Sequence, residues 1–323
     1  ALMAGNAAVL KHASNVPQCA LAIEEVFRDA GFPEGLVGTI LLAGSQVEPV
    51  IADPRVRAVT LTGSSETGSR IAELAGRALK KSVLELGGSD PYIVLADADL
   101  DAAAKVGARA RNQNNGQSCI AAKRFIAVEP VARSFEERFA AEVGALRVGD
   151  PLDPKTQIGP LARADLRETL ERQVRESVRM GARVLVGGER GTGKGWYYQP
   201  TVLADVTEEM PVFKEETFGP VAAVLRVRDA DDAVRVANDS AYGLGASLWT
   251  RDIKVGEALA RRIESGAVFV NGMVASDPRL PFGGLKRSGY GRELSSYGIK
   301  EFVNIQTIWI GEGSQTASGP QSE

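Results

Sequence analysis

Cys119 is the first candidate for covalent chemistry, because the 323 residues contain only two cysteines. It lies in the stretch Asn-Asn-Gly-Gln-Ser-Cys-Ile-Ala-Ala-Lys-Arg, residues 114–124. The turn before it can expose a backbone N–H beside the thiol, which supplies a nucleophile and half of an oxyanion hole. A free cysteine is more often a small buried hydrophobe, so both interpretations stay open. Cys19, in an alanine-rich segment, fits that buried structural role.

Glu85 is the candidate general base. It ends an apolar run and is followed by Leu86, Gly87 and Gly88. Burial in such surroundings removes water from the carboxylate and raises its pKa towards the range of a useful base. A glutamate at the end of a strand is also common without any catalytic role. The sequence around Glu85 does not decide between the two.

A possible phosphate site follows in Thr-Leu-Thr-Gly-Ser-Ser-Glu-Thr-Gly-Ser-Arg, residues 60–70. A strand leads into Gly63, Ser64 can cap a helix that begins near Ser65, and Gly68 permits close approach on the first turn. Free amides at a helix N-terminus suit a phosphate. The stretch is not the Gly-x-Gly-x-x-Gly fingerprint of dinucleotide-binding proteins, and any capped helix shares its other features.

A second glycine-rich stretch, residues 188–195, matches the spacing of a nucleoside-triphosphate loop. Gly195 stands where magnesium coordination needs Ser or Thr, and Trp-Tyr-Tyr-Gln-Pro follows in place of a helix. This stretch is therefore predicted to be a flexible surface loop.

Two further motifs do not indicate a function when each is taken alone. Glu215 and Glu216 precede a Phe-Gly-Pro turn, and a single carboxylate can hold the vicinal hydroxyls of a ribose, although acidic pairs are usually just solvated. Residues 280–293 form a glycine-dense loop that carries Phe282.

Composition excludes several function classes. Thirty-eight basic and 41 acidic residues give a net charge of −3. This charge predicts no positive electrostatic potential that would attract nucleic acid or an anionic membrane. No apolar run is long enough to span a bilayer and no signal peptide is evident, so a cytoplasmic protein is expected. Two cysteines and the single His12 exclude a disulfide framework and a zinc site built from several such ligands, and no metal is expected.

Alternating β-branched and helical runs predict an α/β fold with a parallel sheet. Strands are expected at 7–11, 37–43, 58–62, 91–95, 123–128, 183–186, 221–227, 247–250 and 267–271. Glu129-Pro130 is expected to end the strand at 123–128. Helices are expected from Pro17 and at 100–113, 161–180, 230–238 and 253–265. In the first helix, Ala20, Ile23, Phe27 and Ala30 share a face.

Taken together, the motifs resemble those of the NAD(P)-dependent aldehyde dehydrogenase superfamily over about residues 1–310. The residues that carry the resemblance are, in order, Lys11, Gly63-Ser64, Glu85-Leu-Gly-Gly, Gly116-Gln-Ser-Cys119, Glu216-Thr-Phe-Gly-Pro220, Asn271 and Pro281-Phe-Gly-Gly284. The resemblance implies that Cys119 adds to an aldehyde and becomes acylated, and that Glu85 activates the water that releases the acid.

The same resemblance implies a site for NAD or NADP. The cofactor-binding residues would be Lys11, Ser14, Gly63, Ser64, Leu86, Gly87, Glu216 and Phe218. Family members that use only NAD tend to carry glutamate where this chain has Ser14, so NADP should be tolerated. The residues carried over to the substrate mouth are Gln113, Asn271 and Phe282.

Within the superfamily the chain looks most like bacterial succinate-semialdehyde dehydrogenases. Another such subgroup carries an arginine six residues before the nucleophile, where this chain has Gln113. The substrate is therefore expected to be succinate semialdehyde or a similar short aldehyde. A catalytically silent nucleotide-binding fragment and an acylating enzyme that uses coenzyme A are the alternatives.

The implied fold is a partial Rossmann-type cofactor domain, an α/β catalytic domain and a C-terminal pairing strand. The cofactor domain would take residues 1–86, the catalytic domain 87–287, a return segment with the pairing strand 288–310, and a mobile tail 311–323. Family members have on the order of a hundred or more additional residues before the position that aligns with Ala1. Such a segment is as long as a domain. A homodimer or homotetramer is expected, with 302–310 as the pairing strand.

Overall fold

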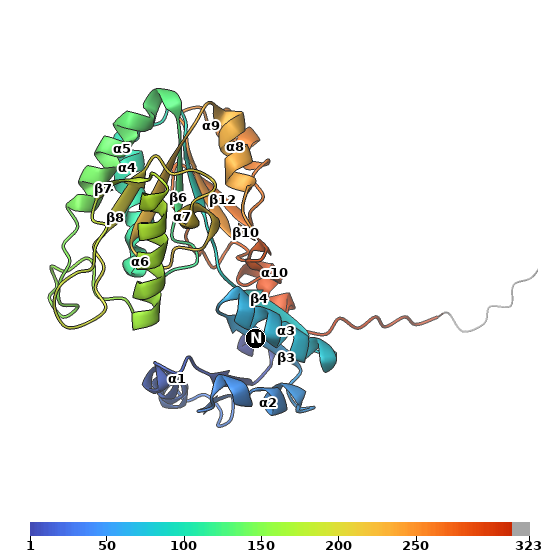
Figure 1. Cartoon of the computed structure of the whole chain (residues 1–323). Helices are drawn as coiled ribbons and strands as arrows, with labels where there is room; N and C mark the ends of the chain where they lie inside the picture. The colour runs from blue at the N-terminus through green and yellow to red at the C-terminus, as the bar shows by residue number, and fades with distance from the viewer. Residues whose placement is uncertain (312–323) are drawn as a thin grey trace, which may run out of the picture. The chain divides into compact units, whose positions relative to one another are not determined.

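The computed structural model describes residues 1–311 (Figure 1). The chain forms two compact units, one containing residues 1–41 and the chain from Ile299 onward, the other residues 42–298. Each is described by itself. The first has a parallel pair of strands linked through a helix, and its elements are η1 (Leu2–Ala4), β1 (Ala8–Lys11), α1 (Pro17–Asp29) and β2 (Val37–Ile40).

Helix α1 corrects the expectation for Cys19, which is exposed and not buried. Ala20 is the buried residue of this helix, whereas Ile23, predicted to share its face, is 45% exposed. Each residue of an α-helix turns the side-chain direction by about 100°. Cys19 therefore points away from the stripe on which Ala20 is buried.

Residues 42–298 contain a small sheet in the order β14-β4-β3. Strand β4 pairs in parallel with β3 and antiparallel with β14. Leu84 and Leu86 pack against Ile71 and Ala75 in a core of their own. The elements of this part are η2 (Gly44–Gln46), α2 (Glu48–Ala52), β3 (Ala58–Thr62), α3 (Ser65–Arg77), β4 (Lys81–Glu85) and β14 (Gly289–Tyr290).

The larger sheet of the same unit has the order β12-β11-β5-β6-β9-β8-β7, with every neighbouring pair parallel except β7 and β8. Its strands are β5 (Pro91–Val94), β6 (Arg124–Val128), β7 (Arg183–Val186), β8 (Thr201–Ala204), β9 (Val221–Val227), β11 (Gly245–Trp249) and β12 (Ala267–Val270). The short strands β10 (Tyr242–Gly243) and β13 (Leu285–Lys286) form a separate antiparallel pair.

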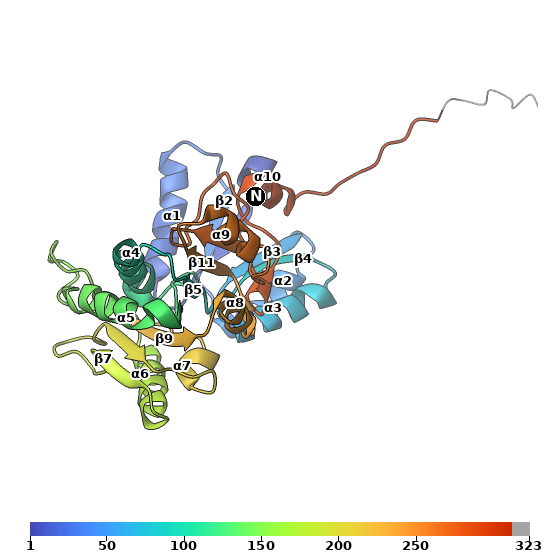
Figure 2. The ribbon, with the colours of Figure 1, turned by 90° about the horizontal axis from the view of Figure 1, so that it is seen from above.

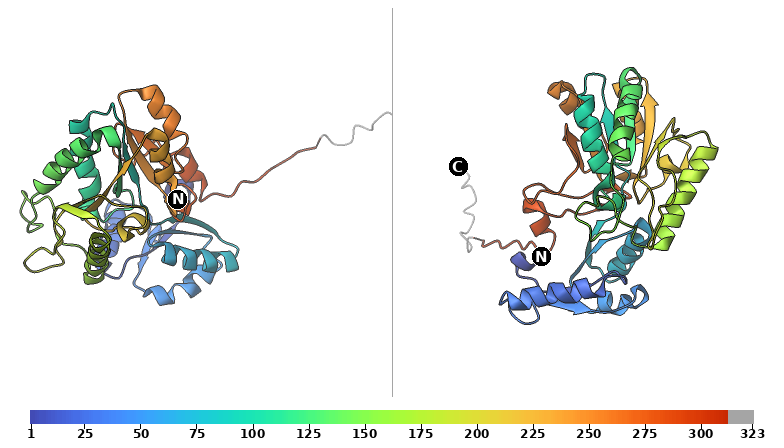
Figure 3. Two further views of the ribbon diagram at one scale, coloured as in Figure 1. Left: turned by 45° about the horizontal axis from the view of Figure 1, so that its top comes forward. Right: turned by 90° about the vertical axis from the view of Figure 1, so that its left-hand side faces the viewer.

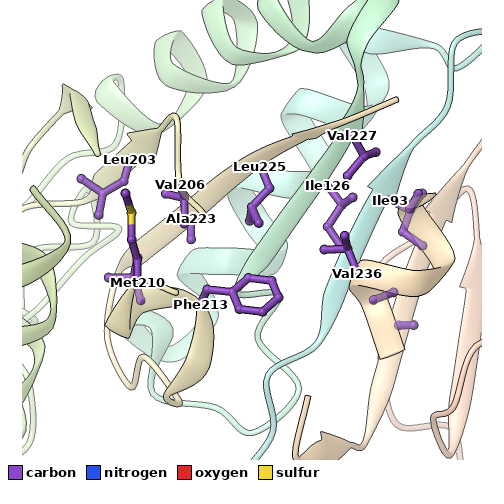
Figure 4. Close-up of a cluster of buried hydrophobic side chains, with 14 of the residues drawn as sticks. Ile93, Ile126, Leu203, Val206, Met210, Phe213, Ala223, Leu225, Val227 and Val236 are labelled. Carbon is purple, nitrogen blue, oxygen red and sulfur yellow. The ribbon is translucent and has the colours of Figure 1, made fainter. Parts of the chain in front are cut away.

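Helices cover both faces of the larger sheet, and the views in Figures 2 and 3 show this layering. They are α4 (Leu100–Asn112), α5 (Glu129–Gly144), α6 (Ala164–Arg179), α7 (Pro211–Lys214), α8 (Ala230–Asn238) and α9 (Ile253–Ala260). A further helix, α10 (Ser295–Lys300), follows later in the chain. Successive residues of β6 alternate between the layers, so that Phe125 packs with α4 and α5 while Ile126 packs with α6 to α9. Figure 4 shows part of the second layer, where Leu225 and Ile126 lie beside Phe213.

The α/β fold predicted from the alternating runs is confirmed, and 58–62, 221–227 and 230–238 have the predicted limits. Helices α5, α7 and α10 and strands β8, β10, β13 and β14 were not predicted. Glu129-Pro130 does end a strand, but Pro130 also fits the first turn of the helix that follows, because that turn needs no donor from it. Helices α6 and α9 are shorter than predicted, since α6 begins at Ala164 and α9 ends at Ala260.

The domain boundaries after residues 86, 287 and 310 stay predictions. No strand is assigned to residues 302–310 of this single chain, and their pairing with another subunit also stays a prediction. The tail predicted at 311–323 lies, apart from Gly311, outside the described residues.

Candidate active site

The candidate active site is built on the residues that link the two sheets of the 42–298 unit. Glu85 ends β4, the central strand of the small sheet, and Pro91 begins β5 in the larger one. Every residue from Val83 to Leu95 is buried, so the Glu85–Asp90 linker between the strands is enclosed by protein. The carbonyl oxygen of Glu85 accepts a hydrogen bond from Gly63 N at 3.0 Å, which joins this linker to the turn before α3.

The Glu85 side chain is a buried carboxyl group without a hydrogen-bond partner. It is 3% exposed, and neither oxygen is hydrogen bonded within the described residues. Burial raises its pKa to about 7, the nearby charge of Glu293 adds to the rise, and Arg292 opposes it. The predicted rise in the pKa of Glu85 is thus confirmed, and both protonation states are accessible near neutral pH.

The segment 114–122, here called the Cys119 loop, leads from α4 into β6. Asn114, Asn115 and Gly116 have φ values of 51°, 56° and 73°, a left-handed run that asparagine and glycine tolerate best. The turn is held against a neighbouring segment, since Asn115 Oδ1 accepts a hydrogen bond from Gly159 N at 2.9 Å. Buried Arg111 donates from a terminal nitrogen to Gly116 O at 2.7 Å. The sequence Asn-Asn-Gly therefore sets a sharp reversal just before Cys119.

Gly88 brings the Cys119 loop and the Glu85–Asp90 linker into contact. A Cβ atom on Gly88 would lie 2.4 Å from the carbonyl oxygen of Cys119, well inside van der Waals distance. Only glycine permits this approach of two backbones. The loop also meets the Phe-Gly-Pro turn, because a Cβ on Gly116 would lie 2.2 Å from Gly219 O. Three segments that are far apart in sequence thus converge on Cys119.

Cys119 is half-buried among charged groups. Burial raises the pKa of its thiol to about 11. The positive charge of Lys123 opposes that rise in pKa, whereas the negative charges of Asp90, Glu216 and Glu85 add to it. The thiol is therefore protonated at neutral pH, and it is close enough to Glu85 for that carboxylate to influence it.

Glu216 lies over the same linker. Its Oε1 accepts from Gly88 N at 2.9 Å and lies 3.8 Å from Lys123 Nζ. A Cβ on Gly87 would come within 2.5 Å of Oε2, so the carboxylate rests directly on this glycine. Phe218, two residues further on, is half-buried. The structure thus brings Glu216 together with Gly87 and the Cys119 loop.

The turn before α3 has the features of an anion-binding helix end. Ser64 caps the helix as predicted, its Oγ accepting from Thr67 N at 3.2 Å. Gly63 and Ser64 are exposed, so the first amides of this 13-residue helix face solvent. The close approach predicted at Gly68 is to Leu86, whose side chain lies 2.5 Å from the position of a Cβ there. Residues suited to a phosphate therefore lie on the helix that packs against Leu86.

The residues predicted for the substrate mouth are not all together. Gln113 Nε2 donates to Ile120 O of the Cys119 loop at 3.4 Å. Phe282 is half-buried and exchanges backbone hydrogen bonds with Glu293. Asn271 follows the carboxyl end of β12, level with the carboxyl end of β5, whereas Cys119 precedes the amino end of β6. The parallel register thus places Asn271 at the opposite edge of the sheet from Cys119.

The Asn271 amide is already engaged there. Its Oδ1 accepts from Thr250 N at 3.0 Å and its Nδ2 donates to Thr250 O at 2.8 Å. Lys11 and Ser14 belong to the 1–41 unit, where Lys11 ends β1 and Ser14 is exposed in the turn before α1. Within the 42–298 unit the structure does not bring Asn271 to Cys119. The roles of Lys11, Ser14 and Asn271 stay predictions.

The model of the aldehyde dehydrogenase family matches residues 1–308. The chain belongs to the aldehyde dehydrogenase family. This aldehyde dehydrogenase chain is 52% identical over 311 residues to succinate-semialdehyde dehydrogenase (NADP+) 1 of Mycobacterium ulcerans, an alignment that covers 96% of the chain and 68% of the relative. It is 50% identical over 323 residues to succinate-semialdehyde dehydrogenase (NADP+) of Mycobacterium avium, covering 100% of the chain and 68% of the relative.

Solved aldehyde dehydrogenases have the same fold. The succinic semialdehyde dehydrogenase of Streptococcus pyogenes, in complex with NADP+, superposes with a TM-score of 0.93 at 42% identity, over 95% of this chain and 68% of that one. A Mycobacterium tuberculosis aldehyde dehydrogenase complexed with NAD+ gives a TM-score of 0.93 at 36% identity, over 98% of this chain and 65% of that one. The resemblance inferred from the motifs is thus confirmed.

Charged groups beneath the Cys119 loop of this aldehyde dehydrogenase escaped the sequence analysis. Asp90, Arg111, Lys123 and Arg124 are buried, and each contacts the loop, the linker or a strand entrance. Lys123-Arg124 at the entrance of an apolar strand was a usable signal, because strand interiors rarely hold two adjacent charges. Among residues 1–311 no helix is long and apolar enough to cross a membrane. In the same range no group of three His, Cys, Asp or Glu side chains could hold a metal.

Proposed function

We propose that the chain oxidises a short aldehyde to the carboxylic acid with NADP or NAD, and that Cys119 and Glu85 carry the chemistry. The observation that carries the proposal is the contact at Gly88, which packs the Cys119 loop on the linker that Glu85 begins. A nucleophile and a base with a pKa of about 7 then share one buried region. The overall reaction consumes an aldehyde, the oxidised cofactor and water, and it yields the acid, the reduced cofactor and a proton.

In the first step the sulfur of Cys119 attacks the aldehyde carbon. The S–C bond forms, the carbonyl π bond breaks, and the thiol proton passes to water, which reaches the half-buried side chain. The product is a thiohemiacetal with its negative charge on the former carbonyl oxygen. Backbone N–H groups aimed at that oxygen stabilise the charge. The N–H of Cys119 itself is the nearest candidate for this task.

A nicotinamide cofactor held there would supply a hydride acceptor, and loss of the hydride would convert the thiohemiacetal on Cys119 into a thioester. Glu85 then takes a proton from water, and the resulting hydroxide adds to the thioester carbon. The C–S bond breaks and the acid leaves. The departing thiolate takes the proton from Glu85, which restores both the thiol and the carboxylate. A carboxylate with a pKa of about 7 serves this step well, since it is largely ionised above neutral pH and still basic enough to accept the proton.

The chain offers suitable groups for the cofactor. The exposed amides at the start of α3, with Gly63 and Ser64, would take the pyrophosphate. Glu216 would accept hydrogen bonds from the nicotinamide ribose, beside Leu86 and Gly87, with Phe218 near the ring. Lys11 would hold the adenosine ribose, and Ser14 would leave room for the 2′-phosphate of NADP. The NADP named in the relatives' descriptions supports this choice.

Succinate semialdehyde is the proposed substrate, supported by the names of relatives at 50% and 52% identity. The test is an aldehyde panel assayed with NADP and with NAD, each with and without coenzyme A, using the 323-residue chain. Formation of succinate without coenzyme A is expected. Product only as a coenzyme A thioester would identify an acylating enzyme, and binding of cofactor without turnover would indicate a silent chain. The homo-oligomer stays a prediction that the same sample tests by its mass in solution.

A further inference from the structure

Lys123 occupies an unusual position, because its side chain is fully buried directly under the Cys119 loop. It is 0% exposed and immediately precedes β6. Its backbone is held on both sides, since its N donates to Asp90 O at 3.0 Å and its O accepts from Ala223 N at 3.1 Å. The base of this side chain is therefore fixed by the sheet. A buried lysine without a complete set of partners would cost free energy.

The ammonium group uses all three of its hydrogens on carbonyl oxygens of the loop. Lys123 Nζ donates to Ser118 O at 3.1 Å, to Cys119 O at 3.1 Å and to Ala121 O at 3.0 Å. Its neighbour Arg124 points to the other side of the strand and donates to Ser89 O, Val236 O and Ala237 O. Two adjacent buried cations thus organise different parts of the backbone.

The orientation of the peptides around Cys119 follows from these bonds. In a trans peptide the C=O and the next N–H point in opposite directions. The carbonyls of Ser118 and Cys119 point at the ammonium, so the N–H groups of Cys119 and Ile120 point away from it. Within residues 1–311 neither N–H hydrogen bonds to another protein group. Lys123 therefore leaves the amide beside the sulfur free to meet a ligand.

The charge of Lys123 acts on the thiol as well. It lowers the pKa of Cys119, against Asp90, Glu216 and Glu85, whose charges raise it. Burial lowers the pKa of Lys123 itself to about 8, Arg111 lowers it further, and Glu216, Asp90 and Cys119 oppose this. Glu216 Oε1 is the nearest carboxylate oxygen, at 3.8 Å. The ammonium is thus the main form at pH 7, as its three acceptors require.

We propose that Lys123 is a positioning residue, which holds the Cys119 loop so that the sulfur and the Cys119 N–H face the reacting aldehyde together. The proposal rests on the proposed role of Cys119 as nucleophile. Lys123 touches the loop carbonyls and not the reacting atoms, so it acts through the geometry and the charge that it gives to Cys119.

The test uses a Cys19→Ser background, in which Cys119 is the single thiol of the chain. Alkylation by iodoacetamide is followed by intact mass from pH 6 to 10 for Lys123→Met and for Arg124→Met. Lys123→Met should slow alkylation about tenfold at pH 7, where the ammonium is the main form, because the thiol loses a neighbouring positive charge. Arg124→Met removes an equally buried cation from the same strand and should lower the melting temperature without moving the alkylation profile.

Turnover provides the second readout. Lys123→Met should lower kcat about 10- to 100-fold, as expected for a misplaced oxyanion donor, with a smaller change in the KM for aldehyde. Profiles of alkylation and turnover that superimpose on those of the parent protein would overturn the proposal. If Cys119→Ala retained turnover, the proposed function would fail, while the effect of Lys123 on the thiol would still be measured separately.

If Lys123→Met does not fold, the parent chain still decides the matter. Lysine labelled with 15N should give one ammonium resonance protected from solvent exchange at pH 7, because its three hydrogens are bonded inside the protein. Alkylation of Cys119 should shift that resonance. A spectrum with no protected ammonium, or one that alkylation leaves unchanged, would contradict the contact between Lys123 and the loop.

Discussion

The two cysteines lie in regions that differ in almost every physical respect. Cys19 is exposed on α1, in a unit where the neighbouring Leu21, Ile23 and Val26 are also more than 40% exposed. Cys119 is half-buried in a loop whose backbone touches Gly88 and is bonded to Lys123. The same side chain is thus a surface thiol in one region and a constrained one in the other.

The surroundings, and not the residue type, therefore distinguish Cys119 as the proposed nucleophile. Burial and the neighbouring carboxylates raise the pKa of the Cys119 thiol, so its surroundings lower the population of the thiolate. The carboxylate of Glu85, the ammonium of Lys123 and free backbone N–H groups lie close to this sulfur. Substitutions at and around the two sulfur atoms test this contrast.

Replacement of each cysteine by alanine tests the contrast directly. Cys119→Ala should lower aldehyde oxidation by more than about 1000-fold, because no covalent intermediate can form. Cys19→Ala should leave kcat/KM unchanged, because its side chain lies on an exposed helix face. Reduced cofactor is measured by absorbance at 340 nm. Equal activity of the two variants would remove the distinction between the regions.

Removal of the charge of Glu85 isolates the water-activating step. Glu85→Gln should lower steady-state turnover about 100- to 10,000-fold, the usual contribution of a general base. A rapid burst of reduced cofactor should remain, because acylation of Cys119 precedes the step that needs the base. In the parent protein the slow step should speed up as pH rises through about 7, where Glu85 ionises. Stopped-flow absorbance would record both, and a missing burst would reassign the base.

Two glycines compare a crowded backbone with an open one. Gly88→Ala places a methyl group 2.4 Å from Cys119 O and should cost about 1 to 3 kcal/mol through displaced backbone. Gly76, inside α3, has no atom within 4 Å of its Cβ position, so Gly76→Ala should stabilise the protein by about 0.5 to 1 kcal/mol. Urea unfolding gives both values. Destabilisation of equal size at the two sites would contradict the close approach.

Stability against pH sharpens the account of Glu85 as a buried acid. Its pKa in the folded protein, about 7, lies above the ordinary value of 4.5 for glutamate, so folding favours the protonated form. Its contribution to stability is therefore present below pH 4.5 and is lost as pH rises through 7. Glu85→Gln should be more stable than the parent by about 1 to 3 kcal/mol at pH 8 and little changed at pH 4. Urea unfolding at the two pH values measures the difference.

Neighbouring carboxylates give the last comparison. Glu216 lies beside the Cys119 loop, whereas Glu215 is bonded to Arg172 and Gln173. Glu216→Gln should raise the KM for cofactor about tenfold, the usual worth of a hydrogen bond to a charged group. Glu215→Gln should change it much less. A larger effect at Glu215 would place the ribose elsewhere.

Much of the fold was readable from local pattern. Capping by Ser64 and the limits of β3, β9 and α8 follow from residues within a few positions of one another. Helix α5 was missed because its first residues, Glu129-Pro130, were interpreted only as the end of a strand. Cys19 was misplaced because composition does not say which face of a helix is covered.

The order of residue types along the chain was enough to place a thiol after an Asn-Asn-Gly turn and a carboxylate at the end of an apolar strand. Only the tertiary structure decided that these two, 34 positions apart, share one buried region, and that Asn271 lies at the other edge of the sheet. The physical reason is the separation along the chain over which each kind of interaction acts. Turn and capping preferences act over a few residues. Packing between distant segments creates the burial that raises the pKa of Glu85, and it also brings the charge of Lys123 close to Cys119.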